Sequence, residues 1–114
     1  MIYKERVLVK HAVTGKMLLD SSVQSEVTYQ IDREEGIIYI KIYAVPKSVS
    51  DEILMLQDEL NVFWFVEPEA GKGETIKHWF YVKPDGGVTY DAASGTLHIV
   101  ADNEIEYHPA DYWA

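Results

Sequence analysis

The chain has 114 residues, of which 47% are hydrophobic and 25% are charged, which suits one folded domain and is too short for two. It contains no cysteine, so a disulfide framework, a thiolate metal site and a cysteine nucleophile are excluded. Ten Lys and Arg against nineteen Asp and Glu give a net charge of -9, which disfavours gripping a phosphate backbone. We therefore expect a single domain over residues 1–114 that binds no nucleic acid directly.

The N-terminus carries Lys4, Glu5 and Arg6 where a secretory signal would begin its apolar stretch. The longest apolar runs, residues 37–40 and 62–66, are far shorter than the roughly 20 residues that a membrane helix needs. The expectation from these features is a soluble, cytoplasmic protein with no membrane partner.

The first half of the chain reads as two hairpins. Residues 6–13 and a return segment from Met17 flank a short turn at Gly15. In residues 26–32 the apolar side chains of Val27, Tyr29 and Ile31 alternate with polar ones, which is typical of a strand with one buried face. Residues 32–36 are then expected to form a loop, with Gly36 in the left-handed conformation. Residues 37–45 form the returning strand of the hairpin.

One helix is expected near residues 49–60. Pro46 ends the preceding strand, and residues 48–52 carry helix-start chemistry, in which a serine hydroxyl is a candidate N-terminal cap. Apolar residues then recur at spacings of four, three and four, which is one face of a helix. These residues are Val49, Ile53, Leu56 and Leu60.

Further strands are expected at residues 62–66, 75–83, 88–90 and 96–101. The first of these is apolar on both alternating sides, which predicts a central strand. Sequential hairpins imply antiparallel pairing. The predicted fold class is therefore α+β, a mostly antiparallel sheet of seven or eight strands with one helix, either open or curled into a half-closed barrel.

The negative charge is concentrated at the C-terminus. Residues 84–114 hold six Asp and Glu and no Lys or Arg. Asp102, Glu104 and Glu106 share one side of an extended chain, whereas Ile105 and Tyr107 share the other. This pattern predicts a strand that docks its apolar side on the domain and holds its acids out to solvent. Asp111, Tyr112 and Trp113 follow, and we expect these residues either to pack back on the domain or to meet a partner.

No catalytic motif is recognisable. The four histidines, His11, His78, His98 and His108, lack the short spacings of a local metal site, and nothing indicates a cofactor. The favoured function is a non-catalytic acidic binding protein, an inhibitor or immunity-type partner such as those linked to phages and other mobile elements. It would dock on a basic protein, such as one that handles nucleic acid, through Asp102, Glu104, Glu106, Tyr107, Asp111, Tyr112 and Trp113.

Two alternatives stay open. The first is a ligand-binding or enzymatic half-barrel whose aromatic cavity is lined by Trp64, His78, Trp79 and Tyr81. The second is a structural subunit of a larger assembly, such as a virion component, and homo-oligomers remain compatible with the sequence.

Overall fold

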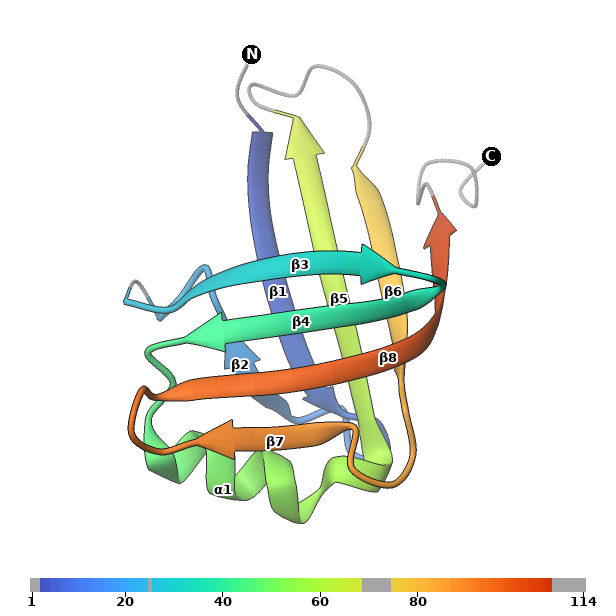
Figure 1. The fold of residues 1–114 in the computed structure, drawn as a ribbon. Helices are drawn as coiled ribbons and strands as arrows, with labels where there is room; N and C mark the ends of the chain where they lie inside the picture. The colour runs from blue at the N-terminus through green and yellow to red at the C-terminus, as the bar shows by residue number, and fades with distance from the viewer. Residues whose placement is uncertain (1–2, 25, 69–74, 108–114) are drawn as a thin grey trace.

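The computed structural model describes residues 3–24, 26–68 and 75–107 and contains one helix and eight strands within them (Figure 1). The strands are β1 (Tyr3–His11), β2 (Met17–Asp20), β3 (Thr28–Glu34), β4 (Ile37–Tyr43), β5 (Leu60–Pro68), β6 (Ile76–Val82), β7 (Val88–Asp91) and β8 (Thr96–Tyr107). The helix is α1 (Lys47–Met55), and a 3-10 turn, η1 (Gln57–Glu59), follows it.

All strand pairs are antiparallel, in the order β2-β1-β5-β6-β8-β4-β3, and β7 also pairs with β8. Figure 1 shows that β1, β5 and β6 cross the direction of β3, β4 and β7. We call β2, β1, β5, β6 and the end of β8 layer one, and β3, β4, β7 and the start of β8 layer two. The sheet thus curls into a half-barrel, which confirms the predicted fold class and resolves the choice between an open and a curled sheet.

A β-bulge lets β8 belong to both layers. The strand pairs with β7 up to Ile99 and with β4 up to Ala101, and it pairs with β6 from Ala101 onward. Val82 lies opposite Ala101, whereas the preceding residue, Tyr81, lies opposite Asn103. Asp102 is therefore the extra residue, and a bulge of this kind bends its strand.

The bulge also reverses which residues of β8 face the interior. Ala101 is fully buried, and unbroken alternation would turn Asn103 and Ile105 inward. Instead Glu104 lies opposite Phe80, a fully buried residue, and opposed residues of an antiparallel pair share a face. Glu104 consequently faces inward, and Ile105, which is 42% exposed, faces outward.

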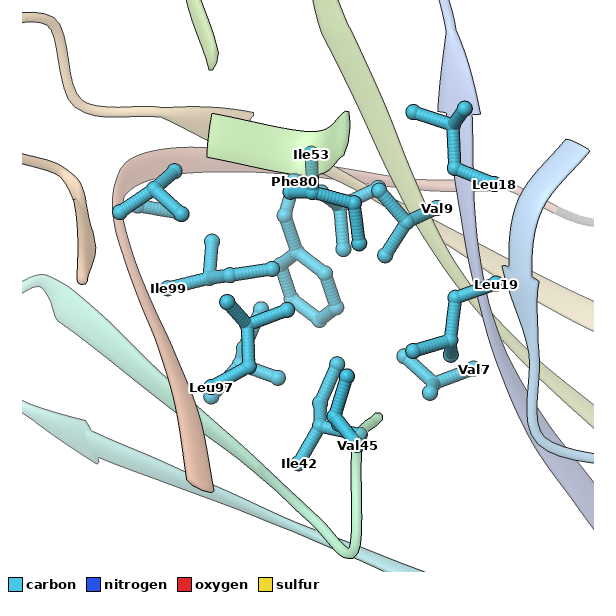
Figure 2. Packing of buried hydrophobic residues seen from close by; sticks show 14 of the residues in the cluster. Val7, Val9, Leu18, Leu19, Ile42, Val45, Ile53, Phe80, Leu97 and Ile99 are labelled. Carbon is cyan, nitrogen blue, oxygen red and sulfur yellow. The ribbon is translucent and has the colours of Figure 1, made fainter. Parts of the chain in front are cut away.

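The hydrophobic core fills the concave side between the layers (Figure 2). Phe80 lies at its centre, Leu97 and Ile99 of β8 lie on one side, and Val9 of β1 lies on the other. Ile53 of α1 is also fully buried, and α1 contacts the edge strands β2 and β7. The helix therefore closes the end of the half-barrel where these two edges diverge.

The hairpin between β3 and β4 has a two-residue turn. Glu35 and Gly36 have φ angles of 51° and 82°, and two consecutive positive values are the type I′ pattern that suits the twist of a hairpin. The expected left-handed Gly36 is confirmed, and the turn is tighter than the predicted loop at residues 32–36.

The helix is confirmed but its bounds differ from residues 49–60. It starts earlier, with Pro46 at the N-cap and no side-chain cap, so the predicted cap by a serine hydroxyl is wrong. It also ends earlier, at Met55, and Leu60 is the first residue of β5. Inside the helix, the hydroxyl of the buried Ser50 donates to the carbonyl oxygen of Lys47 at 2.8 Å.

Candidate functional site

Five side chains from both layers meet on the concave side, and we call them the mouth cluster: Tyr29, Arg33, Trp64, His78 and Glu104. The indole Nε1 of Trp64 donates to the hydroxyl of Tyr29 at 3.1 Å. The rings of Trp64 and His78 stack with centroids 4.6 Å apart, and His78 is only 8% exposed. These contacts join β3, the edge of layer two, to β5 and β6 of layer one.

The ionic part of the mouth cluster is centred on Glu104. Arg33 Nε and Nη2 donate to the two carboxylate oxygens of Glu104 at 2.7 and 3.0 Å. His78 Nδ1 lies 3.3 Å from Glu104 Oε2, and the Arg33 guanidinium lies 5.9 Å from the centre of the Trp64 ring. The hydrogen bond from Arg33 is the main cause that lowers the pKa of Glu104, and the same bond raises the pKa of Arg33.

Tyr29 has its pKa raised, chiefly because burial disfavours the phenolate. The hydrogen bond from Trp64 acts in the opposite direction, and the charge of Glu5 adds to the increase. The polar groups of the mouth cluster are thus engaged with one another. The arrangement is suited to holding the two layers together.

The four residues of the predicted aromatic cavity do not share one face of the sheet. Trp64 and His78 face the concave side, but Trp79 and Tyr81 lie on the outer face of layer one, where their rings are 5.3 Å apart. Adjacent residues of a strand point to opposite faces, so His78 and Trp79 cannot line one cavity.

The outer face of layer one instead carries an aromatic layer, formed by Phe63, Phe65, Trp79 and Tyr81. Phe63 lies 5.6 Å from Trp79, centroid to centroid. The Lys77 ammonium lies 4.3 Å from the centre of the Phe63 ring, a distance at which a cation is attracted to an aromatic face.

An acidic hollow lies where the β3–β4 hairpin approaches the bulge of β8. Its volume is about 330 Å³, and its lining includes Glu34, Glu35, Asp102, Glu104 and a single cation, Arg33. We call Glu34, Glu35 and Asp102 the acidic rim. Over the residues that the structure describes, the acidic rim forms no ion pair, because Arg33 is engaged with Glu104.

The residues predicted to bind a partner do not form one outward row. Asp102 belongs to the acidic rim, whereas Glu104 is 24% exposed and paired. Glu106 is about half exposed, with Oε2 3.8 Å from His78 Nδ1. The predicted docking of the apolar side with the acids held out is therefore wrong for Glu104 and for Ile105, because the bulge at Asp102 exchanges their faces.

The other predicted partner-binding residues lie near or beyond the end of the described chain. Tyr107 is the last residue of β8 and lies opposite Lys77. Asp111, Tyr112 and Trp113, together with His108, lie outside the described residues. His78 and His98 do not pair with each other across strands. His78 lies opposite Trp64 and Glu106, and His98 lies opposite Lys41 and Thr89.

Sequence reasoning missed three residues that matter here. Arg33 shares the side of Val27, Tyr29 and Ile31 on β3, and this parity was the available signal that it faces inward. Glu34 and Glu35 fall in the predicted loop at residues 32–36, and no pattern in the sequence relates that loop to Asp102.

Among residues 3–24, 26–68 and 75–107, no group of three His, Asp or Glu is arranged to hold a metal ion. The helix in this part of the chain is too short and too polar to cross a bilayer. Comparison of the sequence and the structure with protein-family models, curated proteins and solved structures gave no match.

Proposed function

We propose that this chain is a binding protein that docks on a basic protein partner through the acidic rim, in the manner of an inhibitor or immunity protein. The observation that carries the proposal is the convergence of Glu34, Glu35 and Asp102 on one hollow without an ion pair of their own among the described residues. Like charges that crowd together repel one another. A cationic partner surface would relieve that repulsion.

The surroundings of the acidic rim support this role. Asn103 also lines the hollow, and it lies opposite Tyr81 of the aromatic layer. Ile105, on the same outer side, is exposed and lies opposite Trp79. Acidic and apolar side chains thus adjoin along β8, and interfaces combine an apolar, aromatic centre with a polar border.

The pairing of Arg33 with Glu104 sharpens the expected specificity. It engages Glu104, so the carboxylates left to contact a partner at the hollow are those of the acidic rim. Arginine is the cation best suited to bidentate contact with carboxylates. The partner surface is therefore expected to present arginine side chains.

The test compares two variants with the same change in charge. An arginine-rich peptide, labelled with a fluorophore, is the probe. We expect E34Q/E35Q/D102N to weaken its binding about tenfold, since three exposed ion pairs at about 0.5 kcal/mol each amount to roughly one factor of ten. The control E26Q/D58N/D85N neutralises three exposed acids elsewhere. Equal loss in both variants would show that only net charge matters and would contradict the proposal.

A further inference from the structure

A second polar cluster lies where the β1–β2 turn meets η1, near the end of the molecule that carries α1 (Figure 1). His11 Nδ1 lies 2.8 Å from Thr14 Oγ1, and His11 Nε2 lies 2.7 Å from Glu59 Oε1. The imidazole is 12% exposed, whereas Thr14 is exposed on the turn. The three side chains form a chain of hydroxyl, imidazole and carboxylate.

The chemistry of the three groups fixes the direction of these hydrogen bonds. A carboxylate only accepts, so Nε2 of His11 donates its proton to Glu59. In the neutral imidazole Nδ1 is then the acceptor, and Thr14 donates its hydroxyl proton to it. His11 is therefore in the tautomer that can take the Thr14 proton.

Main-chain bonds hold this cluster in place. The backbone N–H of Ala12 donates to the carbonyl oxygen of Glu59 at 2.7 Å, and the N–H of His11 donates to the carbonyl oxygen of Lys16 at 2.9 Å. Glu59 is thus attached to the turn through its backbone and its side chain. The N–H of Lys16 also donates to Thr14 Oγ1 at 3.2 Å, which favours negative charge on that oxygen.

We propose that Thr14 is an activated hydroxyl that accepts an acyl group from a small activated ester, with His11 as the general base and Glu59 as a positioning residue. An activated nucleophile has its hydroxyl within hydrogen-bond reach of a base, and a third group orients that base. The exposed position of Thr14 admits a small ester. This activity is separate from the binding of a basic partner.

The reaction is an acyl transfer in which no group is oxidised or reduced. Thr14 Oγ attacks the ester carbonyl carbon while its proton passes to His11 Nδ1. The tetrahedral intermediate then collapses, the ester C–O bond breaks, and the leaving group departs as an alkoxide or phenolate. His11 releases its proton to solvent, and the acyl group remains on Thr14.

The test exposes the full chain to p-nitrophenyl acetate and maps acetyl groups by tandem mass spectrometry. Hydroxylamine distinguishes acetyl esters, which it removes, from acetylated amines, which it spares. We expect an acetyl ester at Thr14 and none in Thr14→Ala. General-base catalysis contributes about 10²–10⁴-fold, so His11→Gln should slow labelling of Thr14 at least about 100-fold.

Two further variants separate chemistry from structure. In His11→Ala, added imidazole should restore part of the labelling at Thr14, which a purely structural loss would not allow. Thr28 offers an exposed hydroxyl on β3 as an internal reference. Esters formed at Thr28 as fast as at Thr14, labelling of Thr14 that persists in His11→Gln, or no imidazole rescue would each overturn the proposal.

Discussion

Arg33 of β3 and Glu104 of β8 form a two-point hydrogen bond across the concave side of the half-barrel, at 2.7 and 3.0 Å. β3 is an edge strand that pairs only with β4 in the described structure, so its attachment to layer one depends on side chains. The Trp64–Tyr29 hydrogen bond is the second such link. The mouth cluster therefore secures the open side of the sheet as α1 secures its end.

Glu104→Gln should destabilise the fold at neutral pH. The substitution keeps the shape of the side chain but removes the charge from two charge-assisted hydrogen bonds. Such bonds contribute about 1.5–3 kcal/mol each at buried sites, and the partial exposure of Arg33 lowers that figure. We expect a loss of about 1–2 kcal/mol by urea denaturation, and Glu26→Gln, an exposed control, should change stability by less than about 0.5 kcal/mol.

The effect of Glu104→Gln should also depend on pH. The pKa of Glu104 is lowered in the folded state, foremost by Arg33. The ionised form therefore stabilises the fold above the unfolded-state pKa of about 4.3. This stabilisation is lost as the pH falls through the folded-state pKa. Urea midpoints of wild type and variant should converge in acid, and a gap that stays constant down to about pH 3 would contradict this assignment.

Two phenylalanines test the location of the core. Phe80 is fully buried at its centre, so Phe80→Ala should cost about 3–5 kcal/mol. Phe65 lies in the aromatic layer on the outer face and is half-buried, so Phe65→Ala should cost clearly less. Thermal and urea unfolding of both variants measure the difference. Equal losses of stability would contradict this location of the core.

Two isoleucines of β8 test the bulge. Ile99, before Asp102, is buried, whereas Ile105, after it, is exposed. Both are odd-numbered, so unbroken alternation would give them the same face. Ile99→Thr should cost about 2 kcal/mol or more because it buries a hydroxyl, and Ile105→Thr should change stability by no more than about 0.5 kcal/mol. A similar large loss in both would argue against the bulge.

Much of the fold is encoded in short-range patterns. The alternation of Val27, Tyr29 and Ile31 and the glycine at position 36 sufficed to predict the β3–β4 hairpin, because one buried face and one tight turn determine a hairpin locally. The apolar spacing that includes Ile53 likewise predicted the helix. Leu60 continued that spacing but belongs to β5, since a periodic apolar residue also fits the start of a strand.

The candidate site depended on features that local patterns do not show. A single extra residue at Asp102 exchanges the faces of Glu104 and Ile105, and the polar run Asp102-Asn103-Glu104 gives no sign of a bulge. The curl of the sheet then brings Arg33 to Glu104 across the interior. The approach of Glu34 and Glu35 to Asp102 depends on the same curl, so the acidic rim could not be derived from strand alternation alone.

The most direct test of the proposed function is to titrate the chain with the arginine-rich peptide. NMR spectra then report the change in the amide chemical shift of each residue. We predict saturable shifts concentrated at Glu34, Glu35, Asp102 and Asn103, weakening as salt screens the contact. Shifts concentrated away from these residues, or spread evenly over the acidic surface, would contradict docking through the acidic rim.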